Sequence, residues 1–508
     1  MVASSVGVRP ATAAMSFSFK TGALRVAKMA AMNNTVKTVP EPSTSPTRPA
    51  LPPGPACRWF GLPQLRAMGR DYLGFLQGVQ RQHGDVVYMR LAQFRDYSFF
   101  HPDAVRELLV AAHAGLIRWE RGTEVMAAAH GHSVLIAEGH AWQRKRQMLL
   151  PGFAPKRVTA LAPLIVQAGE AALAKWPQAH GDAPVVLNFE HAMTELTMDV
   201  ILRTTFSCSA TPLARAAESA LRVLSQEGFR EMFYPVSAPL WAPWKRAKRQ
   251  ALRVLNELVE GQIAARRRFL AEGHTGPQDL LGMLLDLRDE QDQALSDKEL
   301  RDECMTTFLA GHETSAVALT WWAWCMASHP AAAAQASAEV QALLGPEQRA
   351  PAFADVAALP YLGQTIKEAL RLFPPAPALL TRRCTQALDI GPWHLPKGSM
   401  IRLTPGVMHR DPRWFPEPDA FMPERFAADA AHAIPRGAYM PFGAGPRVCL
   451  GQHFAMTEIT LIAALLLQRF RFSPVPGAEP PRPTLNITLR PHEPLHLRLH
   501  RRLDARAD

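Results

Sequence analysis

The sequence has few cysteines, and they lie far apart. Six are spread over 508 residues, at positions 57, 208, 304, 325, 384 and 449. A small secreted protein held together by disulfides would carry its cysteines densely and at close spacing. This scatter excludes a disulfide framework and predicts a reducing compartment, so we expect a cytoplasmic protein.

Long apolar runs are missing as well. No run reaches the roughly 18 apolar residues of a membrane-spanning helix, and the N-terminus lacks the apolar block of a secretory signal. We therefore expect no transmembrane span. The first forty residues carry five basic residues and no acid, a pattern that also fits a transit peptide and would then indicate an organelle. We expect residues 1–55, which end in the Pro-rich linker VPEPSTSPTRPALPPGP, to be a disordered tail, and residues 56–508 to form the folded domain.

The composition is that of a globular protein, with 48% hydrophobic and 20% charged residues. The net charge of +11 favours anionic partners without indicating nucleic acid. From about Pro102 to Lys367 the chain is rich in Ala, Leu, Glu and Arg at helical spacing. Only GDVVYMRL and the broken segment DIGPWHLPKGSMIR indicate strands, the latter as small hairpins. The sequence predicts a mainly α fold with a minor β part.

The most informative segment is PFGAGPRVCLG, residues 441–451, where one cysteine lies in a glycine-rich loop before a long apolar helix. Gly443, Gly445 and Gly451 allow tight turns, and the start of a helix favours the thiolate form of Cys449, which binds metals. A dinucleotide loop is excluded because Val448 replaces the third glycine. A zinc site is excluded because no second cysteine is close. Cys449 is thus predicted to be a lone thiolate ligand.

A second segment, FLAGHETSAVALTWWAWCMA at residues 308–327, is an apolar helix interrupted by polar residues at 312–314. An interruption of this kind in a core helix indicates function. A zinc protease motif would need a histidine at position 316, which is Ala316. Glu368 and Arg371 in KEALRLFPP are three apart on a helix, and Trp142 and Arg146 in GHAWQRKRQMLLPGF are four apart, so each pair shares a helix face.

Together these motifs resemble the cytochrome P-450 superfamily. The haem-loop pattern of that family, F-x-x-G-x-R-x-C-x-G, is met in full by Phe442, Gly445, Arg447, Cys449 and Gly451. The resemblance implies the cytochrome P-450 fold, with haem b held between the oxygen-binding helix and the helix that follows the cysteine loop. It also implies that Cys449 is the axial ligand of the iron.

The same resemblance assigns roles to other residues. Phe442 would pack near the sulfur, and the haem propionates would be bound by Arg447, Trp142, Arg146 and Arg382, with Arg383 as an alternative to Arg382. Ala310 and Gly311 would open a groove for oxygen, and Glu313 and Thr314 would deliver protons. Glu368, Arg371 and Arg425 of FMPERF would form a structural network behind the haem loop. By position, the substrate pocket would include Val134, Leu135, Phe308, Ala378 and Leu379, all of them apolar.

The implied function is a monooxygenase that inserts one oxygen atom of O2 into a hydrophobic substrate such as a fatty acid, terpenoid or aromatic compound. The chain carries no flavin or iron-sulfur pattern. Electrons from NAD(P)H are therefore expected through a separate ferredoxin or flavodoxin-type donor and its reductase. Two alternatives remain open: a haem-thiolate lyase or isomerase on the same fold, and a haem-binding sensor without turnover. The retained Glu313 and Thr314 count against both.

Overall fold

A computed structural model describes residues 51–176, 183–209, 212–232, 234, 236–345 and 349–502. Residues 1–50, most of the expected tail, lie outside the described residues.

The described residues include the end of the Pro-rich segment. The backbone carbonyl of Pro53 accepts a hydrogen bond from the N–H of Tyr88 at 3.0 Å, and a Cβ at Gly54 would lie 1.9 Å from the Tyr88 carbonyl oxygen. The folded body therefore begins before residue 56, because the end of the Pro-rich segment packs against the first strand.

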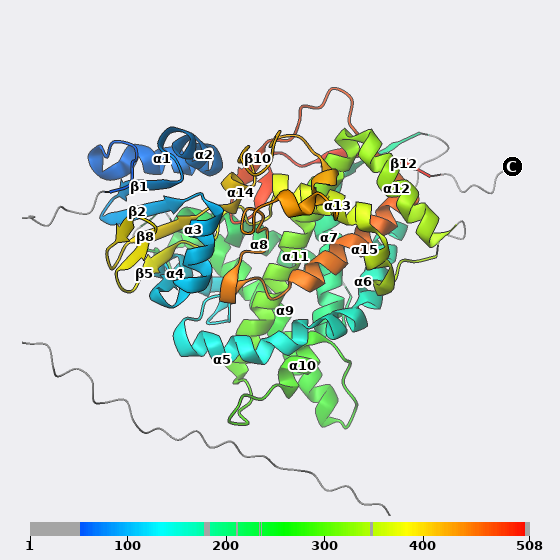
Figure 1. Cartoon of the computed structure of the whole chain (residues 1–508). Helices are drawn as coiled ribbons and strands as arrows, with labels where there is room; N and C mark the ends of the chain where they lie inside the picture. The colour runs from blue at the N-terminus through cyan, green and yellow to red at the C-terminus, as the bar shows by residue number, and fades with distance from the viewer. Residues whose placement is uncertain are drawn as a thin grey trace, which may run out of the picture. The chain divides into compact units, whose positions relative to one another are not determined.

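Most of the fold is helical, as expected. The helices are α1 Leu62–Arg70, α2 Tyr72–His83, α3 Pro102–Arg106, α4 Glu120–His130, α5 Gly139–Leu149, α6 Pro155–Lys175, α7 Phe189–Phe206, α8 Pro212–Glu231, α9 Arg246–Ala271, α10 Leu280–Asp286, α11 Asp297–Ser328, α12 Pro330–Leu344, α13 Pro360–Leu372, α14 Pro405–Met408 and α15 Gln452–Arg469. In Figure 1 the strands β1, β2, β5 and β8 lie at the left together with the first four helices, while α6, α7, α11, α12, α13 and α15 lie at the centre and right.

The strands are short. They are β1 Val86–Leu91, β2 Phe94–Phe99, β3 Leu116–Arg118, β4 Val185–Asn188, β5 Arg382–Cys384, β6 Leu388–Ile390, β7 Trp393–Leu395, β8 Met400–Leu403, β9 Phe470–Pro474, β10 Pro483–Leu485, β11 Leu489–Pro491 and β12 His496–Arg501. One sheet has the order β1-β2-β8-β5-β3, another β4-β12-β9, and two hairpins pair β6 with β7 and β10 with β11. The expected hairpin is β6–β7, but β8 differs from the prediction: it pairs in parallel with β2 and in antiparallel with β5, in the five-stranded sheet.

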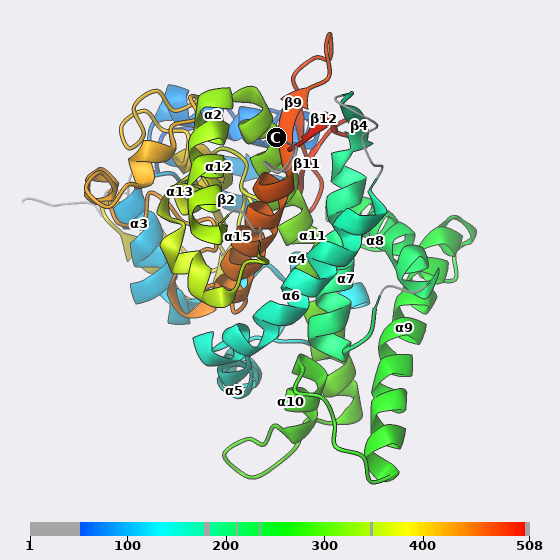
Figure 2. The same cartoon turned by 90° about the vertical axis from the view of Figure 1, so that its right-hand side faces the viewer.

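Helix α11 is central to the helical part (Figure 1). Ser296 caps its N-terminus in a capping box with Glu299. Its first half packs with α8, α9 and α10 in one apolar cluster, which includes Cys304, Met305 and Phe308. Its second half packs with α6, α7, α12, α13 and α15 in another. Figure 2 shows α6, α7 and α11 side by side, with α9 beyond them. One helix therefore belongs to two cores.

No single helix in the described ranges has the length and apolar character of a membrane span. Gly139–Phe153 and Pro155–Lys175, bent by 57° at their junction, meet that criterion only as a pair.

Candidate functional site

The cysteine loop is held in place by its own backbone and by close packing. The N–H of Cys449 donates to the carbonyl of Phe442 at 3.0 Å, which closes the loop. Gly445 has a φ of +73°, and a Cβ there would lie 2.1 Å from the carbonyl oxygen of Leu109. Only glycine fits this contact. The loop is thus fixed between residues 107–111 and the start of α15.

Cys449 lies at the wall of an internal opening. Its side chain is exposed, yet protein surrounds it closely enough for burial to raise the pKa of the thiol, with the Gly451 N–H and the Arg146 cation opposing that shift. A side chain that is both surrounded by protein and accessible borders a hollow within the fold. Phe442, Gly445, Arg447 and Gly451 are partly exposed along the same loop.

Helix α11 presents a matching open stripe. Ala310 is exposed and Thr307, Gly311 and Thr314 are partly exposed, although most residues around them on this helix are buried. Their spacing of three and four residues puts them on one face. The Thr314 hydroxyl donates to the carbonyl of Ala310 at 2.8 Å. An accessible stripe in the middle of a core helix means that no side chain of the described residues fills the space beside it.

The two surfaces come from crossing helices. Ser315, next to the stripe, hydrogen-bonds to Glu458 of α15 at 2.5 Å. Glu458 follows Cys449 by nine positions, so the helix that begins at the cysteine loop meets α11 close to Thr314. The structure therefore brings the helix that follows the cysteine loop next to the stripe of Ala310 and Thr314.

A set of arginines lies at the edge of this region. The guanidinium of Arg447 is 4.2 Å from the centroid of the Trp142 ring, donates to the carbonyl of Ala137 at 3.1 Å and forms an ion pair with Glu138. The backbone N–H of Arg118 donates to the same carboxylate at 3.1 Å. Sequence reasoning found Trp142 and Arg447 but missed Arg118 and Glu138, which belong to no motif.

Arg382 and Arg146 differ from Arg447 in having no carboxylate partner within hydrogen-bond distance in the described part of the chain. Arg382 is 8% exposed and donates to the carbonyl of Leu380 at 2.5 Å. Burial lowers the pKa of Arg382 and, on α5, that of Arg146. The alternative candidate, Arg383, is instead paired with Glu120.

These residues fit a haem. Arg118, Arg382 and Arg447 are buried or mostly buried and surround one carboxylate, Glu138, so positive charge is in excess. Buried charge requires a partner, and the two propionates of haem supply two negative charges. The thiol of Cys449 supplies a soft ligand for iron, and the small side chains of the α11 stripe leave room for a flat group.

The predicted network behind the loop is formed in the structure. Glu368 and Arg371 are both fully buried, and Nε and Nη2 of Arg371 donate to the two carboxylate oxygens at 2.7 and 2.8 Å. Arg425 approaches the same carboxylate at 3.3 Å. The remaining N–H groups of Arg371 donate to three carbonyls of the irregular segment after α14, those of His409, Pro418 and Ala420. The network joins α13 to that segment.

Glu313 is not turned toward Thr314. Its carboxylate accepts hydrogen bonds from Thr488 at 2.7 Å and Ser225 at 3.3 Å, and pairs with Arg490 at 3.0 Å. Burial alone would raise the pKa of Glu313, but Arg490 and Thr488 lower it below its ordinary value. The reason is helical geometry: residues next to each other point about 100° apart. Sequence reasoning missed Thr488 and Arg490 because they lie far along the chain in another element.

Gly311 serves packing as well as the opening. A Cβ at this position would lie 2.6 Å from Cδ1 of Ile201 on α7. The absent side chain therefore lets α7 approach α11 closely, a role that the sequence did not indicate.

The expected pocket residues fall into two groups. One group is partly buried: Val134, Leu135, Ala378 and Leu379. A Cβ at Gly443 in the cysteine loop would lie 3.7 Å from the Leu379 side chain. Phe308 is fully buried in the core with α8 and α9, so the structure does not bring it to the opening. Its position, two residues before Ala310, puts it on another face of α11.

Two further segments meet α8. A Cβ at Gly228 would lie 3.5 Å from Ile487 and 3.8 Å from Val125. Helix α4, helix α8 and the β10–β11 turn therefore meet there. Neither Val125 nor Ile487 carries a sequence signal beyond being apolar.

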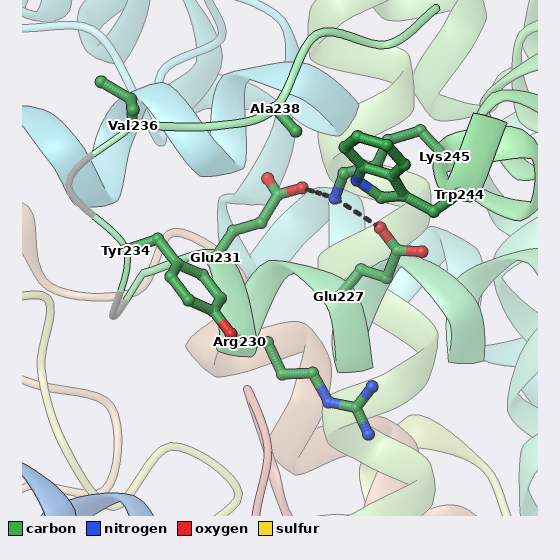
Figure 3. Close-up of a pocket in the computed structure, with 8 residues that line it drawn as sticks. All are labelled: Glu227, Arg230, Glu231, Tyr234, Val236, Ala238, Trp244 and Lys245. Carbon is green, nitrogen blue, oxygen red and sulfur yellow. Dashed lines mark hydrogen bonds and ion pairs between the residues drawn. The ribbon is translucent and has the colours of Figure 1, made fainter. Parts of the chain in front are cut away.

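A separate hollow of about 500 Å³ lies at the α8–α9 connection (Figure 3). It is lined by Glu227, Arg230, Glu231, Tyr234, Val236, Ala238, Trp244 and Lys245. Lys245 is paired with Glu227 at 2.8 Å and also with Glu231. The buried charges of this hollow are thus paired with one another. None of the residues that line the hollow belongs to the cysteine loop or to α11.

Comparison with known proteins supports the same conclusion as the geometry. The family model for cytochrome P-450 matches residues 51–498. Cyclooctatin synthase of Streptomyces melanosporofaciens is 34% identical over 467 residues, which cover 90% of this chain and 97% of that protein. Cyclooctat-9-en-7-ol 5-monooxygenase of the same organism is 32% identical over 418 residues, 81% of this chain and 87% of that protein.

A mammalian protein is also similar. Leukotriene-B4 omega-hydroxylase 3 of Mus musculus is 29% identical over 423 residues, 78% of this chain and 79% of that protein. The names of one monooxygenase and one hydroxylase among the relatives favour oxygen insertion over the lyase and sensor alternatives. The chain belongs to the cytochrome P-450 family and is a haem-iron monooxygenase that uses O2, a hydrophobic substrate and a redox partner.

Proposed function

We propose that Cys449 is the thiolate ligand of the haem iron and that Arg447, Arg382, Arg146 and Trp142 bind its anionic edge. When bound, the haem supplies oxygen activation, which the thiolate ligand favours by donating electron density. The single observation that carries this assignment is the accessible thiol of Cys449 at the wall of an opening. The unpaired Arg382 supports the position of the anionic edge.

The first test is the absorption spectrum of the reduced protein with carbon monoxide, beside a Cys449→Ser variant. We expect a strongly red-shifted Soret band in the native protein and its loss in the variant. A band at the position typical of histidine-ligated haem would contradict the assignment. Cys208→Ser, at a partly buried thiol away from the opening, is the matched control and should keep the native band.

Thr314 is proposed to hold and transfer protons at its hydroxyl, which lies on the open stripe. For Glu313 to supply them, its carboxylate must leave Thr488 and Arg490. Thr314→Ala should lower the fraction of NADPH electrons that reach product, by about tenfold or more, as removal of an acid-base group does. Thr320→Ala, a buried threonine two turns further along α11, is the control. Unchanged coupling in Thr314→Ala would refute the role.

The electron donor is proposed to be an acidic ferredoxin or flavodoxin, reduced from NAD(P)H by its own reductase. The net charge of +11 supports this choice, because opposite charges speed the encounter of two proteins. Turnover with such a donor should fall as ionic strength rises. Turnover that is indifferent to salt would count against an electrostatic encounter and thus against this type of donor.

The substrate is proposed to be a cyclic hydrocarbon or its alcohol. Support comes from two relatives that are 34% and 32% identical, one of which is named for a cyclic alkene alcohol. The partly buried apolar side chains of Val134, Leu135, Ala378 and Leu379 suit such a molecule. Titration of the ferric protein with a cyclic terpene alcohol and with a fatty acid of equal carbon number should give a larger spin-state shift with the alcohol. A larger shift with the fatty acid would overturn this substrate class.

A further inference from the structure

Glu138 is the acid among the cations at the edge of the candidate haem site. It immediately precedes α5, and its side chain is 28% exposed. One carboxylate oxygen accepts from the backbone N–H of Arg118 at 3.1 Å and lies 3.5 Å from its guanidinium, and the other is paired with Arg447. Glu138 thus uses the same cation, two residues before Cys449, that the proposed function gives to the haem.

The charged groups around Glu138 come from four elements. Arg118 lies on β3, Arg382 on β5, Arg447 on the turn Gly445–Arg447 and Glu120 on α4. Glu120 is itself paired with Arg383, whereas Arg382 makes no ion pair among the described residues. Glu138 is therefore the carboxylate that an incoming anionic group would meet when it approaches Arg447.

The charge of Glu138 depends on whether Arg447 is available to it. Burial raises the pKa of Glu138 to about 7, with Arg382 opposing the shift and Glu120 adding to it. Direct contact with Arg447 favours the ionised form. A second carboxylate that takes Arg447 removes that contact and adds a like charge nearby, and both changes favour a protonated Glu138. Binding of a propionate and uptake of a proton by Glu138 are then linked.

We infer that Glu138 competes with the haem propionates for Arg447 and Arg118, so that the haem is held more tightly when Glu138 is protonated. This inference rests on the proposed function. In its ionised form, Glu138 pairs with Arg447 and repels a neighbouring propionate. In its protonated form it leaves both arginines to the haem. The proton comes from solvent on binding and returns to it on release. Glu138 is thus a positioning residue that acts on the haem through Arg447.

The test is the rate of haem transfer from the holoprotein to excess apomyoglobin between pH 6 and pH 8.5, for the native protein and for Glu138→Gln and Glu138→Ala. The readout is the ratio of the native rate to the variant rate at each pH, because groups common to both proteins, Cys449 included, cancel. We expect a ratio near one at pH 6 that rises to about threefold to tenfold at pH 8.5. Uptake of one proton on binding changes the haem affinity by at most tenfold per pH unit.

Two results would overturn the inference. A ratio of one at every pH overturns it. Faster release from both variants at every pH also overturns it, because that result means that Glu138 only holds Arg447 in place. Glu124→Gln, an exposed acid of α4 paired with Arg121, is the control and should give a ratio of one throughout.

The carbon monoxide spectrum of the same native sample separates the two proposals. If the thiolate band is missing, the proposed function fails and this inference fails with it. If the band is present and the ratio stays flat, only the role of Glu138 is overturned.

Discussion

Two clusters of buried charge, one around Glu368 and Arg371 and the other around Glu138 and Arg382, are built differently. In the first, all five N–H groups of Arg371 have acceptors, two on Glu368 and three on backbone carbonyls. In the second, Arg382 is 8% exposed with only a carbonyl as partner, and Nε of the buried Arg118 has no hydrogen bond in the described structure. A cluster whose hydrogen-bond donors and charges all have partners within the protein stabilises the fold. A cluster with unpaired positive charge is suited to bind an anionic ligand.

The variant Arg371→Met tests whether the first cluster stabilises the fold. The variant leaves Glu368 charged and fully buried without its main partner, and removes the donors of three carbonyls. We expect a loss of about 3–5 kcal/mol in the free energy of unfolding, measured by urea denaturation. Arg349→Met, at a more exposed pair with Asp355, is the control and should shift the midpoint little. Equal midpoints for the two variants would remove the distinction between the clusters.

Arg382→Met probes the second cluster and should act in two opposite directions. The haem-free protein should gain about 1 kcal/mol in free energy of unfolding, because an unpaired buried cation is removed. The holoprotein should release haem about tenfold faster, because one charge-assisted contact is lost. Denaturation of the haem-free form and haem transfer to apomyoglobin measure the two effects. A destabilised haem-free form would show that Arg382 belongs to the fold rather than to the ligand.

Glu458 is a third and smaller case, a buried acid whose hydrogen-bond partner is the hydroxyl of Ser315. Burial raises its pKa to about 8. The folded state then holds a proton that the unfolded state releases at lower pH, so stability is present in acid and declines as pH rises toward that value. Between pH 6 and pH 7 the native free energy of unfolding should fall by up to about 1.4 kcal/mol more than that of Glu458→Gln. Parallel curves for the two proteins would contradict the raised pKa.

Local patterns predicted the parts of the site that lie within one segment. The loop from Phe442 to Gly451 and the pair Glu368 and Arg371 depend on spacing over a few residues, and the sequence shows that spacing directly. The mainly α fold follows from helical periodicity, and the family match over residues 51–498 agrees with it. Arg425 was assigned to the network through the resemblance to the family.

What the sequence could not show depends on contacts between distant segments. Arg490 contacts Glu313 although the two are 177 positions apart, and no local sequence pattern links them. Glu138 and Arg447 are 309 positions apart, and β8 joins β2 from a segment that looked like an isolated hairpin. Phe308 was expected at the pocket because periodicity gives the faces of a helix but not which face is open. Arg118 lies on a three-residue strand too short to recognise.

The membership of α11 in two cores has a consequence for how the molecule opens. Local unfolding that exposes the α8–α9 side must break contacts of Cys304 and Met305, and unfolding of the other side must break those of Leu319 and Trp322, all on one helix. Neither side can detach without disturbing α11. The backbone amides in the middle of α11 should therefore exchange with deuterated solvent only through global unfolding and report the full stability of the domain.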